Sequence, residues 1–204
     1  MAAESGDATD EMLMVRYQRG DRQAFAELVR RHSRPMYNFV LRQLRDGTVA
    51  EDVTQEVFLR VVQSAAEFKH EARFSTWLYT IARNHCVDQL RRLAHRRHAS
   101  LDGPIAGSET RTLGELLPEL HPRASAERGV AGAQVLNTIL RAVDALPDDQ
   151  REVFLMRELA NLPFREIAAI TASPENTVKS RMRYALERLR EALADFEEYA
   201  RALR

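Results

Sequence analysis

The sequence has few of the features that mark secreted, membrane-spanning or disulfide-bonded proteins. Its 204 residues include a single cysteine, Cys86, so no disulfide can form within the chain. This usage is typical of proteins in a reducing cytoplasm. No apolar run approaches the roughly 18 residues that span a bilayer, and the N-terminal residues lack the apolar core of a secretory signal. We therefore predict a cytoplasmic protein with no membrane insertion.

Glycine and proline are scarce, with 8 and 7 residues, and no stretch alternates between apolar and polar residues as a half-buried strand would. Long helices are therefore expected. Positive charge is not in excess either, because 30 Lys and Arg residues balance 30 Asp and Glu residues. This balance excludes a wholly basic, histone-like protein. It leaves nucleic acid open as a ligand, because local charge decides such contacts.

Helix breakers and charge divide the chain into four parts. Residues 1–10 carry acids and no base, which predicts a disordered leader. Residues 11–98 and 134–204 show helical periodicity, whereas residues 99–133 are mildly acidic and contain most of the breakers. The predicted fold class is all-α, with two small helical domains joined by an irregular, flexible linker.

The periodicity also predicts individual helices. Pro35 is expected to interrupt the first long helix. The next helix runs from about Ala50 to Ala66. A third begins near Ser75, with Ser75 or a neighbour as its expected N-cap, and runs to about residue 97. In the last part of the chain, the apolar pattern returns at Val135.

Residues 164–181 predict a helix-turn-helix. Ser173 is expected to cap the second helix and Pro174 to occupy its first position. The inner face of this helix is expected to carry Val178, Met182, Leu186 and Leu189. From residue 179 to residue 190 there are five bases and one acid. Because the major groove of DNA admits one helix, which reads base edges near its N-terminus, this pattern indicates DNA binding.

The first domain contains two further patterns. One face of the helix over residues 52–61 is polar, opposite Val53, Val57 and Val61, and on chemistry alone a solvated surface explains it. Residues 69–97 hold seven bases and two acids with aromatic residues interleaved. Stacking surfaces beside a positive track suit a single strand. Most of these aromatics have core spacing, so Phe68, which precedes the helix, is the better candidate for contact with a base.

Nothing in the sequence predicts an enzyme or a cofactor. His95 and His98 are three residues apart and His85 adjoins Cys86, but neither pair has a third ligand at metal spacing. No phosphate-binding loop, nucleophile elbow or pair of catalytic carboxylates is present. We expect no catalysis, no cofactor and no metal.

Two regions of the chain resemble a known family. Four stretches of the first domain resemble region 2 of bacterial extracytoplasmic-function sigma factors. They are Gly20-Asp21, Ala24-Phe25, AEDVTQEVF at residues 50–58 and FSTWLYTIARN at residues 74–84. Residues 146–190 resemble region 4 of the same family. The resemblance implies a sigma factor that binds core RNA polymerase and directs promoter recognition, strand opening and transcription initiation. It also implies an anti-sigma factor as a partner.

The resemblance assigns residues to three surfaces. The polymerase-binding residues would be Asp52, Gln55, Glu56 and Arg60. The residues that bind the −10 element, including the pocket for a flipped base, would be Phe68, Lys69, Arg73, Thr76, Trp77, Arg83, Asn84, Arg91 and Arg92. The residues that bind the −35 element would be Asn176, Thr177, Lys179, Ser180, Arg181, Arg183 and Tyr184.

The chain departs from the family pattern in the helix-turn-helix. Ala172 and Asn176 stand where the family usually has glycine. Because a left-handed alanine costs about 1 kcal/mol, the turn is expected to adopt another geometry. The helix-turn-helix alone leaves a second function open, that of a free-standing DNA-binding regulator. Such a regulator would need a sensor or dimerisation domain in the N-terminal half.

Overall fold

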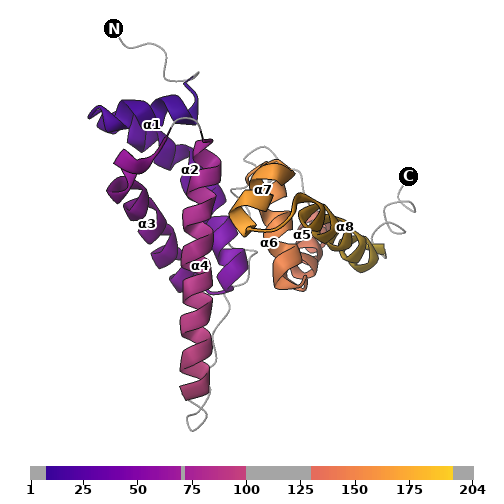
Figure 1. The fold of residues 1–204 in the computed structure, drawn as a ribbon. Helices are drawn as coiled ribbons and strands as arrows, with labels where there is room; N and C mark the ends of the chain where they lie inside the picture. The colour runs from indigo at the N-terminus through magenta and orange to yellow at the C-terminus, as the bar shows by residue number, and fades with distance from the viewer. Residues whose placement is uncertain (1–7, 70–71, 100–129, 195–204) are drawn as a thin grey trace.

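Eight α-helices and one short 3-10 helix make up the described part of the chain, which comprises residues 8–69, 72–99 and 130–194 of a computed structural model (Figure 1). These residues contain no strand, which confirms the all-α prediction. The helices are α1 (Asp10–Gln18), α2 (Arg22–Leu44), α3 (Gly47–Gln63), η1 (Ala65–Glu67), α4 (Phe74–Ala99), α5 (Val130–Asp144), α6 (Asp148–Glu158), α7 (Phe164–Thr171) and α8 (Glu175–Ala192).

Helices α1 to α4 form the first domain, in which α2 packs on α1, α3 and α4. The turn between α2 and α3 reverses the chain in two residues. Arg45 takes a left-handed conformation with φ 58°, and the Asp46 side chain accepts a hydrogen bond from the backbone N–H of Val49. Val53, Val57 and Val61 are fully buried, as their four-residue spacing predicts.

Pro35 does not interrupt α2, so the predicted break is wrong. Leu28 before the proline and Met36, Phe39 and Val40 after it are all fully buried. This packing on both sides of the proline outweighs the one backbone hydrogen bond that proline removes. The boundary between the predicted leader and the first domain also shifts, because Asp10 is the first residue of α1. Residues 1–7 of that leader lie outside the described residues.

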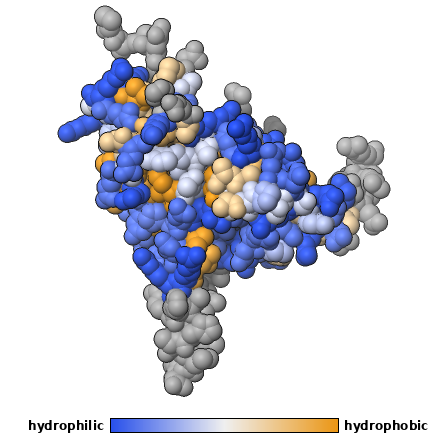
Figure 2. Space-filling model, viewed as in Figure 1, coloured by the Kyte–Doolittle hydropathy of each residue, from blue (hydrophilic) through white to orange (hydrophobic). Residues whose placement is uncertain are grey.

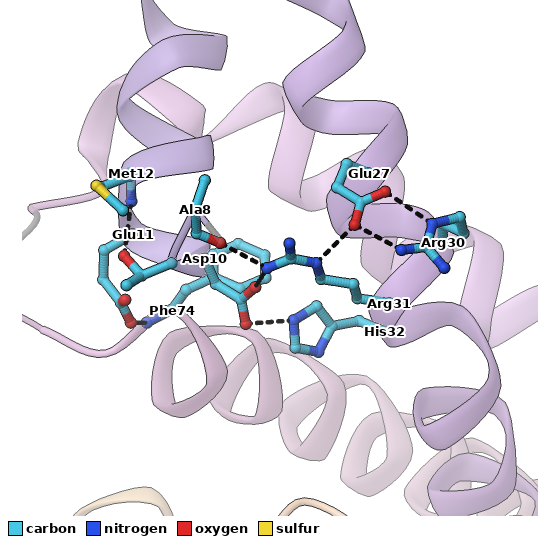
Figure 3. Close-up of polar contacts among 10 residues, drawn as sticks. Ala8, Asp10, Glu11, Met12, Glu27, Arg30, Arg31, His32 and Phe74 are labelled. Carbon is cyan, nitrogen blue, oxygen red and sulfur yellow. Dashed lines mark hydrogen bonds and ion pairs between the residues drawn. The ribbon is translucent and has the colours of Figure 1, made fainter. Parts of the chain in front are cut away.

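A polar cluster fixes α1 to α2 (Figure 3). The Asp10 carboxylate contacts His32 Nε2 at 2.7 Å and accepts a hydrogen bond from Arg31 Nη1 at 3.0 Å. The bond to His32 is the main reason that the pKa of Asp10 is lowered. Glu27 accepts hydrogen bonds from Arg30 and Arg31, which lower its pKa to about 2. The N-terminal helix is thus part of the folded domain.

Helices α5 to α8 form the second domain, whose core includes Val153, Ile167, Val178 and Ala185. Helix α5 begins at Val130, five residues before the predicted return of the pattern. The inner face of α8 carries Ala185 in place of Leu186, which is 46% exposed. Spacing alone did not distinguish these two neighbours.

The turn of the helix-turn-helix keeps the left-handed geometry that the sequence analysis expected it to avoid. Ala172 has φ 49° and ψ 41°, and its N–H donates back to the Ala169 carbonyl. The N–H of Ser173 donates to the Ala168 carbonyl at 3.0 Å, so the two bonds close the end of α7. Ser173 is not the N-cap of α8, because extended Pro174 holds that position and no side chain caps the helix.

The two domains lie against each other along one side of α4 (Figure 1). Helix α7 packs on α4, and α6 packs on α2. The central part of the predicted linker, residues 100–129, lies outside the described residues. Among the described residues, no helix is long and apolar enough to cross a membrane. The face in Figure 2 is mostly hydrophilic, with small separate apolar patches.

Candidate nucleic-acid interface

The exposed face of α3 holds the residues that the sequence analysis assigned to polymerase binding. The side chains of Asp52, Gln55, Glu56 and Arg60 are all exposed. Glu56 contacts His85 Nδ1 of α4 at 3.4 Å. Leu59 lies on the same face, three and four residues after Glu56 and Gln55, and is 59% exposed. The sequence analysis missed Leu59, although this spacing was available to it. The face therefore combines charge with an unburied apolar side chain.

The segment before α4 and the first turn of α4 bring three aromatic rings into one cluster. Phe68 lies 5.2 Å from Trp77 and 6.0 Å from Phe74, measured between ring centroids. Phe68 is only 5% exposed, so its ring forms part of the wall of this cluster and is not open to solvent. Trp77 is half-buried, and Lys69 is exposed. Two of the residues that follow Lys69, His70 and Glu71, lie outside the described residues.

Helix α1 holds both ends of this segment. Gln18 Nε2 donates to the carbonyl oxygens of Ala65 at 2.7 Å and Phe68 at 3.0 Å. At the other end, the Phe74 N–H donates to Glu11 Oε1 at 2.9 Å (Figure 3). Glu11 thus takes the capping role that the sequence analysis gave to Ser75 or a neighbour. Because these pairs are 47 to 63 residues apart in the chain, no local sequence signal could have identified them.

Helix α4 and the residue before it carry further polar and basic residues predicted for the −10 element, and these fall into two groups. Asn84, Arg91 and Arg92 are exposed, with Arg91 3.7 Å from Asp88. The other group contacts acids of the second domain. Arg73 Nε lies 3.1 Å from Glu166, and Arg83 Nε lies 2.8 Å from Glu152. The Thr76 hydroxyl also donates to Glu166.

Helix α8 presents the residues predicted for the −35 element. Exposed members of this set are Asn176, Thr177, Lys179, Arg183 and Tyr184; Ser180 and Arg181 are half-buried.

These side chains have local partners that fix their positions. Lys179 pairs with Glu175 at 2.6 Å, and Arg181 pairs with Asp149 at 3.0 Å. The Arg183 guanidinium lies over the Tyr184 ring at 4.9 Å. Since no side chain caps α8, its first N–H groups remain available to a phosphate.

The described residues contain no group of three or more metal-ligating side chains. Cys86 is buried, and this burial raises the pKa of its thiol to about 12. A thiol in that state is a poor nucleophile at neutral pH. The side chains of His95 and His98 lie outside the described residues.

Comparisons with known proteins match both domains. Residues 28–96 match the family Sigma-70 region 2, and residues 136–189 match Sigma-70, region 4. The ECF RNA polymerase sigma-E factor of Escherichia coli K12 is 34% identical over 183 residues, which cover 90% of this chain and 93% of that protein. The ECF RNA polymerase sigma factor SigW of Bacillus subtilis is 33% identical over 177 residues, covering 87% and 92%.

Solved structures share the fold. The sigma factor RpoE of Bartonella quintana, solved with the anti-sigma factor NepR, aligns with a TM-score of 0.66 at 23% identity over 84% of this chain and 98% of that one. CnrH, solved with the cytosolic domain of CnrY, aligns with a TM-score of 0.61 at 20% identity over 91% and 97%. The two domain matches in this order, together with relatives that cover nearly the whole chain, show that this protein belongs to the family of ECF RNA polymerase sigma factors.

Proposed function

We propose that this chain binds core RNA polymerase and directs it to promoters through two separate DNA-binding surfaces. The observation that carries this proposal is the distribution of surfaces over the two domains. One domain presents the mixed polar and apolar face of α3 together with the basic face of α4, and the other presents the basic helix α8. A free-standing regulator would not need the first two, so this distribution and the family membership favour the sigma factor over that alternative.

The α3 face is the proposed contact with polymerase. Asp52, Gln55, Glu56 and Arg60 supply polar and charged contacts that set orientation and partner choice. Leu59 supplies apolar surface, and burial of an exposed leucine contributes about 1.5–3 kcal/mol. A central apolar residue within a polar rim is the usual arrangement of an interface hot spot.

The aromatic segment and α4 are the proposed site of the −10 element. A flipped base needs an aromatic wall and hydrogen bonds to its edge. The half-buried Trp77 supplies the wall, with the buried Phe68 ring packed against it, and the exposed Asn84 amide supplies donors and an acceptor. Lys69, Arg73, Thr76 and Arg83 would contact the strand near this pocket, and Arg91 and Arg92 would contact phosphates farther along α4.

Helix α8 is the proposed reader of the −35 element. Lys179, Ser180, Arg183 and Tyr184 would face base edges in the major groove, where arginine recognises guanine. Asn176, Thr177 and Arg181 would hold phosphates at the start of the helix. We also propose an anti-sigma factor as a regulatory partner, as the family resemblance implies.

Run-off transcription with core polymerase tests this function, using DNA from upstream of the protein's own gene as template. The wild-type chain should give discrete transcripts. Leu59→Ala should weaken polymerase binding about tenfold, whereas Met12→Ala, which truncates a similarly exposed side chain on α1 (48% exposed), should not. Transcripts that do not depend on the added chain, or a Leu59→Ala variant that binds like wild type, would contradict the proposal.

A further inference from the structure

Helix α1 lies ahead of the residues that match Sigma-70 region 2, which begin at residue 28, yet it contacts the proposed −10 site. It packs on η1 and on α4, and these two helices flank the aromatic segment, which runs from Phe68 to Phe74. The Leu13 and Met14 side chains of α1 are at most 2% exposed, so the helix is anchored in the core of the first domain. A helix anchored in this way is a rigid support for groups that its polar side chains hold.

Gln18, the last residue of α1, holds the start of the aromatic segment. Its Nε2 donates to the carbonyl oxygen of Ala65 at 2.7 Å and to that of Phe68 at 3.0 Å. An amide nitrogen has two hydrogens, so both are used within the protein. The Ala65 carbonyl also accepts the N–H of Phe68, at 3.2 Å. Gln18 thus closes the single turn of η1 and fixes the backbone that carries the Phe68 ring.

Glu11, near the start of α1, holds the end of the aromatic segment. Glu11 and Gln18 are seven residues apart, so two helical turns place them on the same side of α1. Glu11 Oε1 accepts the Phe74 N–H at 2.9 Å (Figure 3). The His32 ring, which contacts Asp10 of α1 at 2.7 Å, lies 5.3 Å from the Phe74 ring. The first turn of α1 therefore fixes the position of Phe74.

The two rings held by α1 enclose Trp77. The Trp77 ring centroid lies 5.2 Å from that of Phe68 and 6.2 Å from that of Phe74. Trp77 is the half-buried ring that the proposed function assigns to the wall of the base pocket. A pocket of this kind discriminates between bases only when its wall and its hydrogen-bonding groups keep a defined geometry.

We propose that α1 is a positioning element of the −10 site. Gln18 and Glu11 hold the two ends of the aromatic segment, and this fixes the Trp77 wall relative to the exposed Asn84 amide. Both residues act through the segment, and neither is assigned a contact with the base. The inference rests on the proposed function, because it needs Trp77 to form part of the base pocket.

Loss of the Gln18 contacts should loosen the pocket without unfolding the domain. Gln18 is exposed, so its replacement leaves no cavity in the core, and substitutions at such positions change stability little. The two hydrogen bonds together favour the held arrangement of the segment over a released one by roughly tenfold. Because only the held arrangement discriminates between bases, preference should fall with its population.

The test compares substitutions at matched positions of the full chain. Gln18→Met keeps the length of the side chain and removes both donors, and Gln18→Glu places a carboxylate against the two carbonyl oxygens. Glu11→Ala releases the other end of the segment. Gln23→Met makes the same change as Gln18→Met at an exposed position near the start of α2 and is the control.

The first measurement needs neither DNA nor polymerase. Trp77 is the only tryptophan, so acrylamide quenching of its fluorescence reports how closely Phe68 and Phe74 enclose it. Gln18→Met and Glu11→Ala should raise the quenching constant, and Gln23→Met should leave it at the wild-type value. Urea unfolding of the same variants checks that the domain stays folded. Unchanged quenching in both α1 variants would overturn the inference, because the rings would then be held without α1.

The second measurement is base preference, which a purely structural role would not change. Run-off transcription with core polymerase is compared between the promoter upstream of the protein's own gene and versions with single −10 bases replaced. In Gln18→Met, preference should fall by about threefold, less than the tenfold that the lost bonds allow. The fall should occur at the position whose preference Asn84→Ala also changes. Gln18→Glu should lose more, and Gln23→Met should lose nothing.

Preference at −35 positions is the internal reference and should stay unchanged in every α1 variant. An unchanged −10 preference in Gln18→Met or Gln18→Glu would overturn the inference, even if Trp77 becomes more accessible to acrylamide. An equal loss at −10 and −35 positions would also overturn it, because the effect would then be a general one on the fold.

The two measurements separate this inference from the proposed function. If the wild type initiates transcription but Gln18→Met neither exposes Trp77 nor loses preference, α1 is no positioning element and the function stands. If Gln18→Met exposes Trp77 and the wild type supports no transcription, the proposed function fails. The hold of α1 on the aromatic segment is then a structural contact alone, which overturns its role at the −10 site.

Discussion

Glu11 should determine how firmly the start of α4 and the aromatic cluster are held. Its carboxylate accepts the Phe74 N–H at 2.9 Å and adds negative charge at the positive end of α4. Loss of a capping acceptor costs about 1 kcal/mol, and loss of the charge adds about 0.3–1 kcal/mol. Glu11→Ala should therefore lower the free energy of unfolding of the first domain by about 1–2 kcal/mol. Glu11→Gln keeps a hydrogen-bond acceptor, so it should lose only the part of this free energy that comes from the charge.

The protein contains a natural probe for this measurement. Trp77 is the only tryptophan, and its ring lies 6.2 Å from that of Phe74. Urea unfolding followed by Trp77 fluorescence reports on this domain directly. Glu51→Ala, at an exposed position of α3, is the control and should change stability by less than about 0.5 kcal/mol. The proposed capping role is refuted if Glu11→Ala and Glu51→Ala unfold at the same urea concentration.

Four other substitutions test separate parts of the structure. Arg183→Ala should weaken selection of the −35 sequence by about 1–3 kcal/mol in a competition binding assay, with little effect on unrelated duplex. Asn84→Ala should change base preference at a single −10 position, and an unchanged preference would remove Asn84 from the pocket. Ala172→Gly should raise thermal stability by about 0.5–1 kcal/mol, because glycine relieves the left-handed strain at φ 49°. Asp10→Asn should cost about 1 kcal/mol at pH 7; because folding lowers the pKa of Asp10 below 3.8, the contribution is present above that pH and should vanish as the pH falls through the folded value.

The features that the sequence predicted correctly depend on short spacings. Val53, Val57 and Val61 repeat every four residues and are buried as expected. The exposure of Asp52 and Gln55 on the opposite side of α3 follows from the same period. The helix-turn-helix was also recognisable because its turn and its two apolar stripes lie within residues 164–189. Local periodicity was therefore enough to predict most of the helices and their buried faces.

The features that the sequence did not predict depend on distant residues or on competing energies. Glu11 caps α4 across 63 residues, and Arg83 meets Glu152 from the other domain. The residues next to Glu11 and Glu152 in the sequence give no indication of which distant residue each acid contacts. Local rules predicted a helix break at Pro35 and no left-handed backbone at Ala172. Tertiary packing outweighs both rules, since buried side chains hold both segments in place.

Promoter binding with and without polymerase is the most direct test of the central claim, which is that two cationic surfaces on separate domains act together only on the polymerase. The measurement is the affinity of the purified chain for a duplex promoter fragment, alone and after addition of core polymerase, with footprints of both complexes. The expected result is weak binding alone, and with polymerase a tight complex protecting both the −10 and the −35 elements. Tight, sequence-specific binding by the isolated chain, or no association with core polymerase, would contradict it.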